Sequence, residues 1–200
     1  MLLPDSLHDI LKQRTWWLQL EPQWQLAFQE TVLGHKNAPT DDELQNIGSL
    51  TVLRLVGPSA PFPNMTFELT NLSGLSHLTN LEMLFVTHHA IHSLKELEKL
   101  DKLTKLFIND NQLSSLKGIE AMINMEQIYC QNNQISSLKP VQNLIKLTEL
   151  YAHSNELTTL EGLTEEHSDL LKTFLCFPND KLHQREVIRV ENTFGIKCKG

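Results

Sequence analysis

Apolar residues recur at intervals of 22 along the middle of the chain. This interval separates the members of two rows, which are Leu81, Leu103, Met125 and Leu147, and Leu84, Leu106, Ile128 and Leu150. Asparagine recurs at the same interval in a third row, Asn111, Asn133 and Asn155, with His89 in the equivalent position one interval earlier. A fixed period of this length predicts a solenoid, in which each unit adds one layer to a continuous core.

Each unit combines two spacings of apolar residues. Leu106 and Ile108 lie two residues apart, so on a strand their side chains point to one side and Phe107 points to the other. After the strand, apolar residues follow at every third position, at Leu113, Leu116, Ile119 and Met122. This spacing predicts helical or 3-10 turns along the convex side. The asparagine that ends each strand is expected to bond to the turn backbone, because an amide both donates and accepts.

The pattern extends in both directions from the central units. It predicts six strands, at residues 50–56, 81–87, 103–109, 125–131, 147–153 and 171–177. The first unit is lengthened by a Pro-rich loop at 57–64, and the last carries a two-residue insertion within 164–168. We expect one structural domain with three parts, a helical N-terminal cap at 1–48, repeats at 49–179 and a C-terminal capping helix at 180–200.

The two predicted caps carry helix signals of their own. Pro22 suits the first turn of a helix, and Thr40 with Glu43 forms a capping box for another. Residues 182–194 predict a C-terminal helix, which Gly195 closes.

The repeats resemble the 22-residue class of leucine-rich repeats that occurs in bacterial internalins and in a eukaryotic phosphatase regulatory subunit. The resemblance covers about residues 50–179 and is carried by four consecutive units that keep register. It implies an α/β fold, a leucine-rich repeat solenoid with a curved parallel sheet on the concave face and turns on the convex face. It also implies binding as the class of function. Internalins are exported and this chain has no sign of export, so we do not transfer their role.

Four aromatic side chains share one outward column of the predicted sheet. We call this set the aromatic ladder: Phe85, Phe107, Tyr129 and Tyr151. The chain has eight phenylalanines and two tyrosines, so four in one column is a large share. The candidate site adds five polar neighbours, Asn109, Asp110, Gln131, Asn132 and His153. An aromatic centre with a polar rim is typical of protein interfaces. The alternative interpretation is that aromatic residues suit strands and simply stack on one another.

The sequence therefore predicts a protein-binding module that uses its concave face, performs no chemistry, and binds a protein or peptide. The alternative is a self-associating structural protein that buries the aromatic ladder in a homodimer. No nucleophile elbow, phosphate loop or carboxylate pair is readable, so we expect neither enzyme activity nor a cofactor. The net charge of −7, without a basic stripe, predicts no direct nucleic-acid binding. Trp16 and Trp17 could form a second contact site, but we favour a role in the cap.

Three histidines, His88, His89 and His92, lie close together in the sequence. His88 is expected to face the concave side, His89 the inward asparagine position and His92 the convex turn. Side chains with three different directions cannot surround one ion, so we predict no metal site. A cross-strand pair of His88 with Asp110 is expected instead.

The three cysteines predict reduced thiols. Cys130 and Cys176 occupy inward strand positions, and Cys198 lies near an end that is expected to fray. The first nine residues lack a basic start and a long apolar run, so no signal peptide is expected. No stretch approaches the roughly 18 apolar residues of a membrane helix. These features together predict a cytoplasmic location without a membrane partner.

Overall fold

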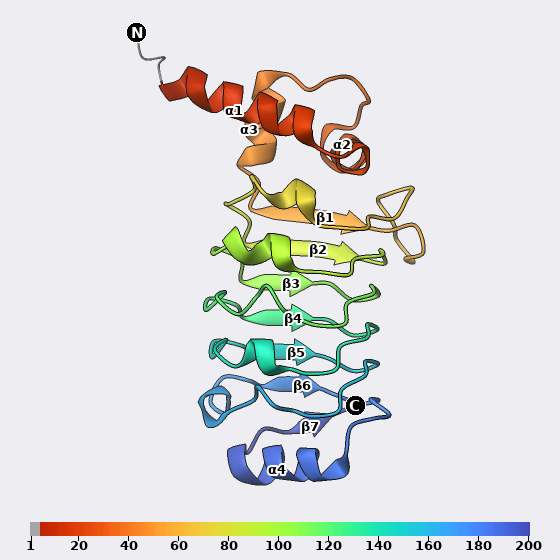
Figure 1. Ribbon diagram of the computed structural model, residues 1–200, viewed down its shortest axis with the longest axis vertical. Helices are drawn as coiled ribbons and strands as arrows, with labels where there is room; N and C mark the ends of the chain where they lie inside the picture. Colours follow the sequence, from red (N-terminus) through yellow and green to blue (C-terminus); the bar gives the residue numbers. More distant parts are fainter. Residues whose placement is uncertain (1–4) are drawn as a thin grey trace.

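Within residues 5–200, which the computed structural model describes, seven short strands stack as the rungs of one parallel sheet (Figure 1). They follow one another in chain order from β1 to β7, at Val52–Val56, Met83–Thr87, Lys105–Phe107, Gln127–Tyr129, Glu149–Tyr151, Thr173–Leu175 and Cys198–Lys199. A parallel sheet whose strands follow chain order is the architecture of a solenoid. The predicted fold class is confirmed.

The register of the sheet follows the repeat. Leu84 pairs with Leu106, which lies 22 residues later. Units of unequal length keep the same register, because Leu53 pairs with Leu84 across 31 residues and Leu150 pairs with Phe174 across 24. The extra residues therefore form loops and turns outside the strands, where they leave the pairing unchanged.

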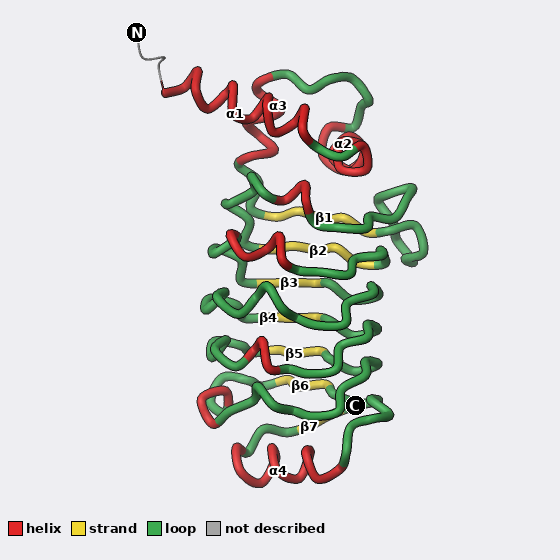
Figure 2. Tube along the Cα trace, in the orientation of Figure 1, coloured by secondary structure: helices red, strands yellow, loops and turns green. Residues whose placement is uncertain are grey.

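Turns and short 3-10 helices return the chain on the opposite side of the core from the sheet (Figure 2). The 3-10 helices of the described residues are η2 to η5, at Ser73–Leu75, Lys95–Lys99, Lys139–Val141 and Glu165–His167. Side chains from strands and turns meet in one core, in which Leu84, Leu97 and Leu106 are fully buried. Each such leucine contributes roughly 1.5–3 kcal/mol of hydrophobic stabilisation. The stack is thus held by layers that no single repeat could bury alone.

A row of polar side chains follows the strands and bonds to the backbone of the turns. We call it the asparagine ladder, and it consists of His89, Asn111, Asn133, Asn155 and Asn179. Asn133 shows the pattern. Its Oδ1 accepts from the backbone N–H of Leu113 at 2.9 Å, and its Nδ2 donates to the carbonyl oxygens of Ile108 and Cys130 at 3.0 and 3.1 Å. One amide therefore joins its own repeat to the preceding one, as the sequence predicts.

His89 takes the asparagine's place with an imidazole ring. Its Nδ1 accepts from the backbone N–H of Leu69 at 3.1 Å, and its buried Nε2 has no hydrogen-bond partner among residues 5–200. Burial lowers the pKa of His89 to about 4, since the charged ring would lose its hydration. The ring is therefore neutral at pH 7, which leaves Nδ1 free to accept.

Helices close the N-terminal end of the stack. They are α1 to α3 and the π-helix η1, at Asp5–Gln19, Pro22–Phe28, Asp41–Gly48 and Gln29–Leu33. Pro22 begins α2, and Thr40 and Glu43 form the predicted capping box of α3. None of the helices described between residues 5 and 200 combines the length and the apolar character that a membrane crossing requires.

Three tryptophans attach this cap to the first repeat. Trp16 and Trp17 are buried against Phe28, which favours the cap interpretation of these two residues. Trp24 is fully buried, and a Cβ atom at Gly74 would lie 2.1 Å from its ring. A side chain at position 74 cannot fit without displacing the indole, so the first repeat needs glycine there.

The C-terminal segment contains a strand as well as the predicted helix. The helix α4 comprises Gln184–Phe194, and Gly195, with a φ of 70°, ends it. The chain then returns to the sheet as β7, where Cys198 pairs with Phe174. The predicted six strands are present, but the sheet has a seventh in the segment that was predicted to be only a capping helix. The prediction that Cys198 lies at a frayed end is wrong, because β7 has backbone partners.

The cysteines of residues 5–200 are all free thiols. Cys130 and Cys176 are fully buried in the core, and burial raises the pKa of the Cys130 thiol to about 12. A thiol with so high a pKa carries almost no thiolate at neutral pH, so Cys130 is a packing group.

Candidate functional site

The register of the sheet assembles one outward column on the concave face. The paired positions are Arg54, Phe85, Phe107, Tyr129, Tyr151, Leu175 and Lys199. The four members of the aromatic ladder therefore lie side by side, as predicted. Lys199 joins this column through β7, a strand that the sequence did not predict.

The rings of the aromatic ladder stack on one another. The ring centroids of Phe85 and Phe107 lie 4.2 Å apart at an interplanar angle of 7°, and those of Tyr129 and Tyr151 lie 4.1 Å apart at 18°. Phe107 and Tyr129 join the two pairs at 4.6 Å and 33°. All four side chains are half-buried. The two central rings have neighbours on both faces, so their edges form the part that an incoming molecule would meet.

Glu149 fixes the tyrosine in the middle of the ladder. The Tyr129 hydroxyl donates a short hydrogen bond to Oε2 of Glu149, and Nε2 of Gln127 donates to Oε1 at 3.2 Å. Burial, followed by this hydrogen bond, raises the pKa of Tyr129 above its usual range. The phenol therefore stays neutral and keeps its proton on the bond to Glu149. Neither Gln127 nor Glu149 belongs to the predicted site, although both lie two residues before ladder tyrosines.

A chain of polar contacts runs along the rim, where the strands end. Asp110 accepts from Nδ2 of Asn109 at 2.5 Å and from Nδ2 of Asn132 at 2.9 Å. Nε2 of His88 lies 3.5 Å from the same carboxylate, which is the cross-strand pair that the sequence predicts. Four residues at the strand ends have φ between 54° and 59°, namely His88, Asp110, Asn132 and Ser154, and two of them, Asp110 and Asn132, belong to the rim. Asparagine, aspartate and histidine tolerate this conformation better than most residues, which explains part of the rim composition.

The other two predicted rim residues also lie at the strand ends. Nδ1 of His153 lies 3.2 Å from Oγ of Ser154. Oε1 of Gln131 is buried and has no hydrogen-bond partner among residues 5–200.

The Pro-rich loop extends the surface beyond the ladder. Arg54 donates from Nη2 to the carbonyl oxygen of Phe62 at 3.1 Å. Asn64 holds the loop to β1, since its Oδ1 accepts from the N–H of Val56 and its Nδ2 donates to the carbonyl oxygen of Arg54, both at 2.7 Å. The Phe62 side chain is 82% exposed. This apolar group was not in the predicted site, and the sequence signal that could have found it is a phenylalanine between two prolines.

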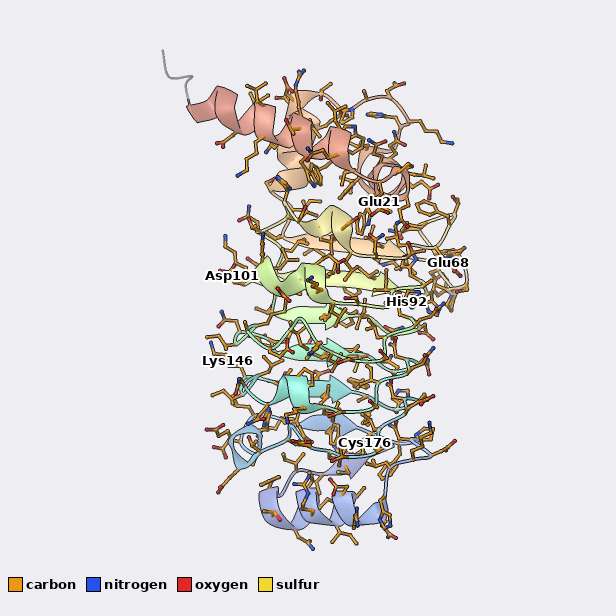
Figure 3. The ribbon with its side chains drawn as sticks, viewed as in Figure 1. Glu21, Glu68, His92, Asp101, Lys146 and Cys176 are labelled. Atoms are coloured by element: carbon orange, nitrogen blue, oxygen red, sulfur yellow. The ribbon has the colours of Figure 1, made fainter. Side chains whose placement is uncertain are left out.

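The described residues bring no metal cluster together. No group of three His, Cys, Asp or Glu side chains between residues 5 and 200 could hold an ion. His88 faces Asp110 and His89 is buried in the asparagine ladder. His92 lies at the edge of the stack where the strands end, opposite the edge that carries Asp101 and Lys146 (Figure 3).

One hollow of the surface lies away from the predicted site. It has a volume of about 460 Å³, lies between convex turns and is lined by residues that include Ser115, Lys117, Ser137 and Lys139. None of its lining residues belongs to the aromatic ladder or its rim. We give more weight to the ladder than to this hollow, because the hollow is an open gap between turns with exposed lysines.

Comparison with known proteins identifies the repeats. Two overlapping stretches, residues 101–143 and 123–165, match the family model described as leucine-rich repeats in two copies. These stretches contain β3, β4 and β5, whose 22-residue register generates the asparagine and aromatic ladders. The repeats of this chain are leucine-rich repeats. Leucine-rich repeat domains are typically protein-binding modules and are generally non-catalytic.

Solved structures share the fold of this leucine-rich repeat protein. An internalin, InlF, from Listeria monocytogenes matches 58% of this chain and 38% of its own, with a TM-score of 0.52 and 24% identity. A leucine-rich repeat protein of Leptospira interrogans matches 83% of this chain and 40% of its own, with a TM-score of 0.59 and 23% identity. The chain thus spans about two fifths of the length of each, and at these identities the likeness is one of fold. No curated protein sequence matches the chain.

Proposed function

We propose that this leucine-rich repeat protein is a binding module, which recognises a protein or peptide on its concave face and performs no chemistry of its own. The observation that carries the proposal is the stacked aromatic ladder, which spans four neighbouring repeats and remains half-exposed. Aromatic side chains bury a large area at a small entropic cost when a partner covers them. The site comprises the ladder and the rim residues Asn109, Asp110, Gln131, Asn132 and His153.

The rigidity of the surface supports the same proposal. Stacking holds each ring against its neighbours, and Glu149 holds Tyr129 in addition. The rim is held by the bonds among Asn109, Asp110 and Asn132. A surface that is already ordered loses little conformational entropy on binding, so a larger part of the contact energy remains as affinity.

The centre of the ladder should dominate the binding energy. We expect Phe107→Ala and Tyr129→Ala each to weaken binding by about 2 kcal/mol or more, because a partner would exclude water from the central rings first. The experiment is affinity capture from source-cell lysate with the wild-type chain, followed by titration of the captured protein against each variant. Lys117→Ala, on the convex side, is the control and should leave the affinity unchanged.

Two results would contradict this function. Unchanged affinity in the Phe107→Ala and Tyr129→Ala variants would remove the site from the concave face. A concentration-dependent dimer in light scattering, lost in the same variants, would instead support the self-associating structural protein.

We also propose a cytoplasmic location. Its support is the set of free thiols at Cys130, Cys176 and Cys198, which a reducing compartment preserves. Fractionation of source cells with an antibody to the chain tests it, and recovery from the medium would contradict it.

A further inference from the structure

The aromatic ladder offers ring edges rather than ring faces. The centroid separations of 4.1–4.6 Å leave no room for another group between the rings. An aromatic ring carries negative charge density on its faces and positive charge density at its edge. The edges of Phe85 and Phe107 are therefore weakly electropositive, and they favour carbonyl oxygens, carboxylates and the faces of a partner's aromatic rings. The two tyrosines carry a hydroxyl at this edge, and that of Tyr129 is bonded to Glu149.

Two cations stand at the ends of the same column. The register places Arg54 beside Phe85 at one end and Lys199 beyond Leu175 at the other. Both side chains belong to exposed residues, and neither forms an ion pair with a carboxylate within residues 5–200. Their separation is six strand spacings of about 4.8 Å, or roughly 29 Å.

Two carboxylates near the ladder accept hydrogen bonds from neighbouring side chains. Glu149 accepts from Tyr129 and Gln127, and Asp110 accepts from Asn109 and Asn132. These donors are neutral, so both carboxylates keep their charge beside the ladder. The charged members of the paired column itself, Arg54 and Lys199, are both cations, although the whole chain carries a net charge of −7. At physiological ionic strength the Debye length is about 8 Å, so a bound group responds mainly to charges in its immediate surroundings.

We infer that the concave face selects an acidic, aromatic-containing segment of a protein partner, which crosses the strands from Arg54 to Lys199. Its carboxylates pair with the two end cations, and its carbonyl groups and aromatic faces lie over the ring edges of the ladder. An extended segment of about nine residues covers the roughly 29 Å between the cations. This inference rests on the proposed function, because it assigns a partner chemistry to the same face.

The test uses a displayed library of random linear peptides of about 16 residues, long enough in extended form to exceed 29 Å. Peptides selected on the immobilised full chain are sequenced, synthesised and titrated against it. We expect enrichment in Asp and Glu together with Tyr, Trp or Phe. We also expect affinity to fall as salt rises from about 50 to about 300 mM, because screening weakens exposed charge pairs.

Charge reversal then locates the contacts. Arg54→Glu and Lys199→Glu should each weaken peptide binding about tenfold, since an attraction is replaced by a repulsion. Arg54→Lys should retain most of the affinity, which guards against an effect of the lost bond to Phe62. Lys117→Glu makes the same change in net charge on the convex side and should leave the affinity unaltered.

The outcomes separate this inference from the proposed function. If Phe107→Ala abolishes peptide binding but both end reversals leave it intact, the concave site stands and the acidic partner is rejected. Equal loss in Lys117→Glu would assign the effect to net charge and would also reject it. Peptides that bind equally well to the Phe107→Ala variant would overturn the concave site itself. Enrichment of basic or uncharged peptides, or of none, counts against the inference.

Discussion

The asparagine ladder and the aromatic ladder repeat at the same interval on the same strands, yet they differ in what surrounds them. Asn133 is 8% exposed and its amide bonds to backbone groups of two repeats. Phe107 is half-buried and contacts chiefly the rings of Phe85 and Tyr129. The amides of the four asparagines in the first ladder bond to the backbone inside the chain, whereas the second ladder leaves its ring edges without a contact.

This difference gives a criterion for interpreting repeated columns. A column whose members complete the backbone of their neighbours is explained by folding, because a buried unpaired amide costs about 1–3 kcal/mol. A column that is ordered but incompletely covered needs a further explanation, and a partner supplies one.

Lowering the pH should destabilise the folded chain through His89, a member of the asparagine ladder. Its pKa is about 4 in the folded chain and about 6.5 when unfolded, so only the unfolded chain gains a proton between those values. The free energy of unfolding should therefore fall as the pH drops from 6.5 to 4, by up to about 3 kcal/mol from this residue. Denaturant melts across this pH range measure the slope.

The replacement His89→Asn introduces the residue type of the other four ladder positions. It should remove the part of the pH dependence of the unfolding free energy that His89 causes. The buried His167 also has a lowered pKa and will keep part of the pH dependence. His92→Asn, at an exposed histidine, is the matched control. If His89→Asn and His92→Asn give the same slope as the wild type, His89 does not hold the ladder in the way described.

Loss of an asparagine should be the next largest effect. Asn133→Ala leaves the N–H of Leu113 without an acceptor and removes one of the two amide bonds to each of the carbonyl oxygens of Ile108 and Cys130, so we expect a loss of about 2 kcal/mol in unfolding free energy. Urea melts measure it against Gln134→Ala, the exposed neighbour. Equal stability of the two variants would remove the ladder's structural role at this position.

Loss of a ring should cost less stability. Phe107→Ala removes two stacked contacts at a half-buried position, and we expect a loss of about 1 kcal/mol. The same urea melts test it, with Phe107→Tyr as the control that keeps the stack. A loss larger than that of Asn133→Ala would show that the aromatic ladder is chiefly a folding element, and it would weaken the proposed binding role.

A reducing agent should leave the stability of the chain, and so of both ladders, unchanged. Cys130 and Cys176 directly follow β4 and β6, which β5 separates, so they lie about 9.6 Å apart, beyond the reach of a disulfide. Dithiothreitol should therefore leave the melting temperature unchanged. A clear fall on reduction would reveal a disulfide and would contradict the cytoplasmic proposal.

The repeated part of the molecule follows from the order of its residues alone. The 22-residue interval set the register, and the register placed the rings of the aromatic ladder side by side. It also placed Asn111, Asn133 and Asn155 at equivalent turns. These features are local and periodic, so each follows from counting residues once one strand is assigned.

Contacts between distant or irregular segments depend on the tertiary structure and could not be predicted from the residue pattern. The strand β7 has two residues and no leucine spacing, so nothing local distinguishes it, and with it Lys199 joins the central column. The stacking angles, the bond from Tyr129 to Glu149 and the contact of Arg54 with the Phe62 loop depend on side-chain rotamers that packing selects. A repeat fixes which residues are neighbours, whereas the packed neighbours themselves determine which surface of each side chain remains exposed.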